Sequence, residues 1–157
     1  MQTTLNQIKA KSPCESGWKK LLKHLGKTKA DDAPLPLLTI LESNGLMDAV
    51  WCLRAVKDED SKIRKMACEF ALSVKHLWNM PLIVREYLTT QNETIRERAR
   101  DAAYAAYAAA YAAYAAAYDA DAAAAADAAY AAAAYDAADA AEKIKQVEIF
   151  KRICMEV

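Results

Sequence analysis

Apolar residues recur at helical spacing along most of the chain, and no stretch alternates apolar and polar residues as a half-buried strand would. Gly and Pro, the residues that most often interrupt helices, occur only before Leu82. The second half should therefore be helical nearly throughout. The pattern predicts an all-α protein without a sheet, in which packed, solenoid-like helical hairpins precede a long helical segment.

Capping signals locate the expected helices. Thr3 or Thr4 can cap a short first helix that carries Leu5 and Ile8. The residues from Ser12 to Glu15 form a capping box with Pro at the first helical position, and the helix that follows should end at Gly26. Further helices are expected at about 36–43, 46–56, 61–78 and 81–88, and a second capping box, Thr90-Gln91-Asn92-Glu93, should open the next one.

The segment from 101 to 141 contains only 28 Ala, 7 Tyr and 6 Asp residues. Ala has the highest helix propensity, so this low-complexity tract should be an ordered helix. Five tyrosines follow a 3-4-3-4 spacing, which is that of a heptad seam: Tyr104, Tyr107, Tyr111, Tyr114 and Tyr118. Two interpretations stay open. The seam could pack inside the protein, or it could be an exposed strip that anchors a protein partner, with aspartates as an acidic rim.

The tyrosine spacing breaks at Asp121. One helix from Thr94 to the last residue would be about 95 Å long, whereas a compact domain of this size has a radius of gyration of about 15 Å. Asp119 and Asp121 could each cap a new helix, so we expect the tract to fold back as a hairpin. The alternative is a long straight helix that projects as an arm.

The last residues regain an ordinary amphipathic pattern, with an apolar stripe of Ile144, Val147, Phe150, Cys154 and Val157. Such a helix needs a surface on which to pack. We therefore predict a compact helical domain over 1–100, followed by a segment over 101–157 in which this last helix packs on the Ala-rich tract.

Charge is balanced overall, with 21 basic and 21 acidic residues, but it is unevenly distributed. Residues 1–30 carry seven Lys and one Glu, and the tract carries six Asp and no cation. Lys19, Lys20 and Lys23 fall on the polar face of the second helix and could contact an acidic partner. A nucleic-acid binder acting through these lysines is an alternative function, although no aromatic platform accompanies them.

Little in the sequence indicates catalysis. The four cysteines are far apart and form no C-x-x-C pair, so we expect small buried hydrophobes in a reducing cytoplasm rather than a disulfide or zinc site. The two histidines accompany no nucleophile or paired carboxylates, and no Gly-rich loop is present. We therefore predict no catalytic residue, cofactor, metal or small-molecule substrate. The first residues lack the apolar core of a signal peptide, and no membrane span is expected.

Three stretches carry a resemblance to a known family: SPCESGWKKLL from Ser12, LTILESNGL from Leu38 and WCLRA from Trp51. With these stretches, the chain resembles a family of small bacterial and phage immunity proteins whose C-terminal tract is also Ala interrupted by aromatic and charged residues. Here those residues are Tyr and Asp, where relatives often have Trp and Arg. The resemblance implies an all-helical protein that binds and neutralises a toxin or effector.

Together these observations predict a non-enzymatic protein-binding module, an immunity-type or phage-borne inhibitor. Its expected contact residues are the five tyrosines of the seam, Asp119, Asp121 and the three lysines. A structural protein that self-associates through the tyrosine seam, and therefore forms a homo-oligomer, is the second alternative to this function.

Overall fold

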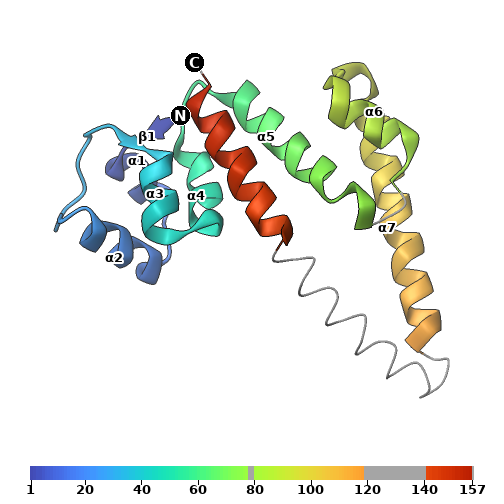
Figure 1. Ribbon diagram of the computed structural model, residues 1–157, viewed down its shortest axis with the longest axis horizontal. Helices are drawn as coiled ribbons and strands as arrows, with labels where there is room; N and C mark the ends of the chain where they lie inside the picture. The colour runs from blue at the N-terminus through green and yellow to red at the C-terminus, as the bar shows by residue number, and fades with distance from the viewer. Residues whose placement is uncertain (78–79, 119–140, 157) are drawn as a thin grey trace. The chain divides into compact units, whose positions relative to one another are not determined.

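The computed structural model describes residues 1–77, 80–118 and 141–156, and Figure 1 colours them along the chain. These residues belong to two compact units. Unit 1 consists of Met1–Met66 and Ile149–Val157, and unit 2 of Ala67–Glu148. Most described residues are helical, so the predicted all-α fold class is confirmed. The predicted domain boundary at residue 100 stays a prediction.

Besides the end of the last helix, the described residues of unit 1 form four helices and the start of a fifth. They are α1 (Leu5–Lys9), α2 (Glu15–His24), α3 (Leu37–Asn44), α4 (Leu46–Cys52) with a 3-10 turn η1 (Leu53–Ala55), and the first part of α5 (Asp60–Ser73). Thr4 caps α1 by accepting a hydrogen bond from the backbone N–H of Gln7, as predicted. Gly45, at φ 93°, separates α3 from α4 in a conformation that an L residue rarely adopts.

The prediction that the protein has no sheet is wrong. Strand β1 (Gln2–Thr3) pairs antiparallel with β2 (Leu35–Pro36), with Thr3 opposite Leu35. Each strand has two residues, which is too short for an alternating pattern to register in the sequence. The pairing holds the first residues against the segment that leads into α3.

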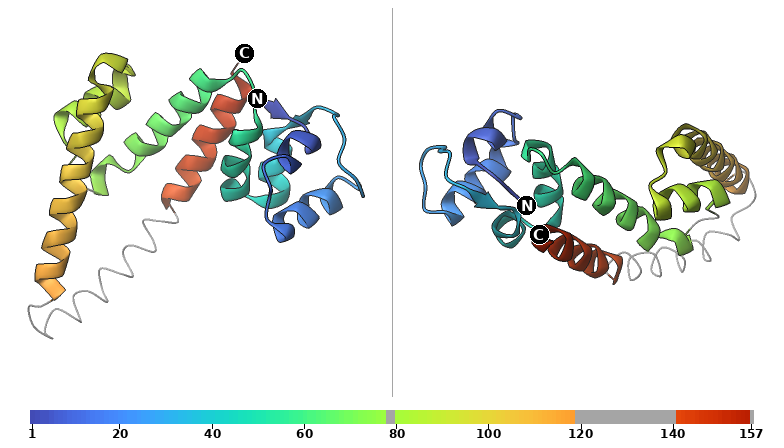
Figure 2. Two further views of the ribbon diagram at one scale, coloured as in Figure 1. Left: turned by 180° about the vertical axis from the view of Figure 1, so that it is seen from behind. Right: turned by 90° about the horizontal axis from the view of Figure 1, so that it is seen from above.

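The core of unit 1 joins the beginning and the end of the chain. Its most deeply buried large side chains are Leu5, Ile8, Leu37, Ile40, Met66, Phe150 and Ile153. The amino group of Met1 donates a hydrogen bond to the carbonyl oxygen of Cys154 at 2.7 Å. The first strand and the end of the last helix accordingly lie together in Figures 1 and 2.

The predicted capping box at the start of α2 does not form. Ser12 has a left-handed backbone, at φ 55°, and the helix begins at Glu15 after an extended Cys14 that makes no side-chain cap. The end of α2 is as predicted. Gly26, at φ 63°, donates to the carbonyl of Lys23, and Lys27 donates to that of Leu22, which is the Schellman arrangement.

Unit 2 contains the rest of α5 and the helices that follow it. They are η2 (Lys75–Leu77), α6 (Leu82–Thr90), η3 (Glu93–Ile95), α7 (Arg96–Tyr118) and the part of the last helix that precedes residue 149. The second predicted capping box is also misplaced. Gln91 ends α6 with a left-handed backbone, and the side chain of Asn92, rather than Thr90, caps η3 by accepting from the backbone N–H of Thr94.

The last helix is described over 141–155. Its predicted apolar stripe is buried towards the end, at Phe150 and Cys154, but Ile144 is 63% exposed. The described part of the stripe is therefore not packed along its whole length. The predicted fold-back at 119–121 lies outside the described residues, as do Asp119, Asp121 and Val157.

Candidate functional site

The tyrosine seam lies on α7, and two of its side chains are described. Tyr104 and Tyr107 are 69% and 71% exposed, which is unusual for large aromatic residues. Three residues apart on a helix, they lie on one face, and the residues between and after them are Ala. Tyr111, Tyr114 and Tyr118 also belong to α7, with side chains outside the described part.

The polar residues near these tyrosines are exposed as well. Arg100 pairs with Asp101 at 3.3 Å, with side chains 63% and 70% exposed. The result is an aromatic pair on an Ala-rich helix, one turn beyond a solvated ion pair.

The three predicted lysines are brought together on α2. Lys19, Lys20 and Lys23 are all exposed, and Lys19 pairs with Glu15 one turn earlier. An exposed pair of this kind contributes little to stability. The lysines belong to unit 1 and the described tyrosines to unit 2.

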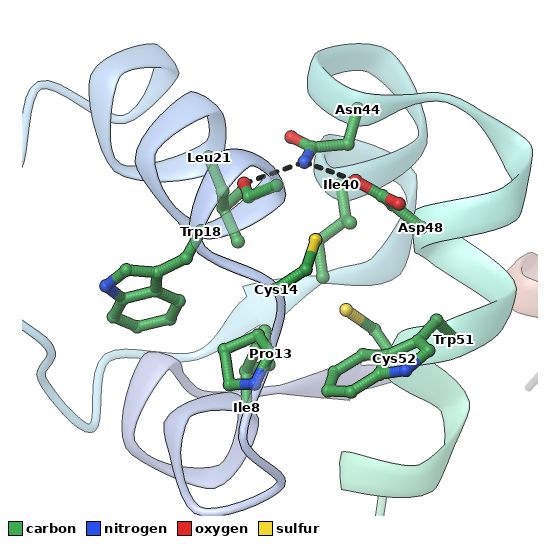
Figure 3. A pocket seen from close by; sticks show the side chains of 11 residues that line it. Ile8, Pro13, Cys14, Trp18, Leu21, Ile40, Asn44, Asp48, Trp51 and Cys52 are labelled. Carbon is green, nitrogen blue, oxygen red and sulfur yellow. Dashed lines mark hydrogen bonds between the residues drawn. The ribbon is translucent and has the colours of Figure 1, made fainter.

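Sequence reasoning missed a pocket in unit 1. Its volume is about 150 Å³, and side chains from α1, the following loop, α2, α3 and α4 line it (Figure 3). The lining residues are Ile8, Pro13, Cys14, Gly17, Trp18, Leu21, Ile40, Asn44, Asp48, Trp51 and Cys52. Most of this lining is apolar, and Cys14, which contributes to it, is exposed.

The polar end of the pocket is a small hydrogen-bond network (Figure 3). The side-chain nitrogen of Asn44 donates to the carbonyl oxygen of Gly17 at 2.9 Å and to Oδ2 of Asp48 at 2.7 Å. The Oδ1 atom of Asn44 accepts from the hydroxyl of Ser43. Asn44 is thereby fixed in orientation, and it holds the Asp48 carboxylate in place.

Gly17 allows α2 to approach this network closely. A Cβ atom at this position would lie 2.9 Å from Oδ2 of Asp48 and 3.1 Å from the sulfur of Cys14. A single Gly inside a helical pattern is a sequence signal for such close packing. Together with Asn44 and Asp48, which are four residues apart, it could have indicated the pocket.

Three of the four cysteines are buried, as predicted, and none of the four forms a disulfide. The prediction is wrong for Cys14, which is exposed because it precedes the first helical residue of α2, although it lines the pocket beside Trp18. Burial raises the pKa of Cys52 to about 11, with Asp48 raising it further and Arg54 lowering it. The Arg54 guanidinium lies over the Trp51 ring, 4.5 Å from the ring centre.

Among the described residues, no three His, Cys, Asp or Glu side chains are grouped so that they could hold a metal ion. In the same part of the chain, none of the helices combines the length and the apolar character that a membrane span requires. Comparison of the chain with protein-family models, with curated proteins and with solved structures gives no match.

Proposed function

We propose that the protein is a non-enzymatic protein-binding module that contacts its partner through the tyrosine face of α7, defined by Tyr104 and Tyr107. The observation that carries this proposal is the exposure of both rings, at 69% and 71%, on one face of a helix. Exposed aromatic residues that share a surface are typical of interaction sites.

The chemistry of this face suits a protein partner. Tyrosine has few rotatable bonds, so its burial in an interface costs little conformational entropy, and its hydroxyl can form hydrogen bonds at the edge. The neighbouring Ala residues present no long side chains that would keep a partner backbone away. Arg100 and Asp101 supply the polar rim that surrounds a typical interface core.

The partner class follows from the resemblance to immunity proteins, and we propose a toxin or effector that this module neutralises in the cytoplasm. None of the four cysteines forms a disulfide, which supports this compartment, because thiols stay reduced where the environment is reducing.

The proposal is tested by capturing proteins from a host lysate with the purified chain and with Tyr104→Ala/Tyr107→Ala. Both substitutions replace Tyr by Ala, which has the higher helix propensity, so the variant should keep its helix content. Truncation of an interface tyrosine costs about 2 kcal/mol at a hot spot, or roughly thirtyfold in affinity. We expect the double variant to lose a protein that the wild type captures.

The matched control is Met47→Ala/Leu82→Ala. These two large apolar residues are 81% and 79% exposed, but they lie outside the tyrosine face. The control should capture the same protein as the wild type. Retention of every captured protein by the tyrosine variant would contradict the proposal.

A further inference from the structure

The pocket of unit 1 has the size and lining of a site for one small ring. A cavity of about 150 Å³ accommodates a benzene-sized molecule when its walls are apolar. Here Ile8, Leu21 and Ile40 supply aliphatic walls, and Trp18 from α2 and Trp51 from α4 supply two indole rings. Apolar pockets with a few fixed polar groups are the usual form of small-ligand sites.

The fixed polar group is the Asp48 carboxylate. Its Oδ2 atom accepts from Asn44, whereas Oδ1 accepts no hydrogen bond and meets no cation among the described residues. Asn44 is already committed to Gly17, Asp48 and Ser43, so it has no remaining donor to offer a ligand. A ligand would therefore meet the Asp48 carboxylate at the polar end of the pocket and mostly apolar walls elsewhere.

In the described part of the chain, no cationic side chain lines the pocket. Arg54 stacks on Trp51, but it does not line the pocket. Among the described residues that line the pocket, Asp48 alone carries an ionised side chain. The charge at the pocket is therefore negative, which favours a cationic ligand.

We propose that this pocket binds a small organic ammonium that carries a single aromatic ring, with the ring against Trp18 and Trp51 and the ammonium on the carboxylate of Asp48. Ring contact with the indoles supplies apolar burial and cation–π attraction. The charge-assisted hydrogen bond to Asp48 selects the ammonium over a neutral group of equal size.

Titration of the full-length chain with three probes of nearly equal size tests the proposal. Benzylammonium, benzyl alcohol and benzoate are added at equal ionic strength, and the indole N–H signals of Trp18 and Trp51 are followed by NMR. Because a charged hydrogen bond exceeds a neutral one, benzylammonium should bind about tenfold more tightly than benzyl alcohol. Benzoate should bind more weakly than either. Equal affinity for the ammonium and the alcohol, or no shift of either indole signal, would overturn the proposal.

A substitution of Asp48 tests whether its carboxylate causes the preference for the ammonium probe. Asp48→Asn keeps the shape and can still accept from Asn44, but it removes the charge, so the preference for the ammonium should fall about tenfold. Glu42→Gln, which removes an exposed carboxylate of α3, is the control and should leave the preference unchanged. An Asp48→Asn protein that retains the full preference would also overturn the proposal. If this variant does not fold, the comparison of the three probes on the wild type decides alone.

Discussion

At the scale of single residues, Thr3 shows how the short sheet is fixed to the rest of unit 1. Its side chain is buried, and its hydroxyl donates a hydrogen bond to the carbonyl oxygen of Ala55 at 2.7 Å. This bond links β1 to the turn after α4, across 52 positions of sequence. A buried carbonyl that loses its donor keeps its desolvation cost without compensation.

We therefore expect Thr3→Val, which keeps the shape of the side chain, to lower the free energy of unfolding by about 1–3 kcal/mol. Chemical denaturation followed by circular dichroism measures this change. Thr28→Val, at an exposed position, serves as the control and should have little effect. Equal stability of the two variants would show that the Thr3 hydrogen bond is unimportant.

Two other residues explain why both predicted capping boxes were misplaced. Ser12 and Gln91 have left-handed backbones, at φ 55° and 54°, and each follows a short helix closely. A Ser or Thr three residues before Glu predicts a helix start from local sequence. That local pattern does not show that the same residues already form the end of a preceding helix. The helices themselves were predictable, but these starts were not.

The left-handed backbone of Gln91 gives a second prediction. Gln91→Gly should raise the free energy of unfolding by about 0.5–1 kcal/mol, because Gly adopts this conformation without strain and the strain relief exceeds its entropy cost. Gln146→Gly, inside the last helix, should instead lower it by about 1 kcal/mol. Thermal denaturation of both variants provides the comparison, and a destabilising effect of Gln91→Gly would contradict the account.

At the scale of elements, Glu156 attaches the end of the last helix to α5. Its carboxylate oxygens lie 2.7 and 2.8 Å from Nζ of Lys65, and its carbonyl accepts from Lys62 at 2.9 Å. The hydrogen bond from Lys65 holds the pKa of Glu156 below its usual value of 4.5. A carboxylate with a lowered pKa stabilises the fold above its unfolded pKa, and the effect disappears as the pH falls through the folded pKa.

Glu156→Gln should therefore make stability less sensitive to acid. Between pH 7 and pH 3, the wild type should lose more free energy of unfolding than the variant, because only the wild type gives up this ion pair. Glu148→Gln changes the charge equally at an exposed position of the same helix and should behave like the wild type. Urea unfolding at the two pH values makes the measurement, and identical losses in wild type and Glu156→Gln would contradict it.

The arrangement of the helices also explains why the pocket was not predicted from the sequence. Its lining comes from five segments between Ile8 and Cys52, and each residue has an ordinary local role. Trp18 belongs to an apolar helix stripe, and Asn44 belongs to a helix end. Their convergence depends on how α2 approaches α3 and α4, which helical spacing alone does not specify.

At the scale of the whole molecule, the sequence was sufficient for the helical class and for most helix positions, because helix periodicity is a local property. It was also sufficient to single out the tyrosines of the Ala-rich tract. Their exposure could not be predicted, because a heptad spacing is equally typical of a buried seam and of an exposed face. Tyr104 and Tyr107 are exposed in the structure, and this exposure supports the proposed binding face.

The most direct test of that face is site-specific photo-crosslinking. A photoreactive phenylalanine analogue is placed at position 104 or 107, and at position 47 as a control of similar exposure. After irradiation in the host, positions 104 and 107 should form a covalent adduct with the same partner protein. Wild-type protein without the analogue should compete for this partner, whereas Tyr104→Ala/Tyr107→Ala should not. Adducts that are absent at both positions, or no more abundant than at position 47, would contradict the proposed function.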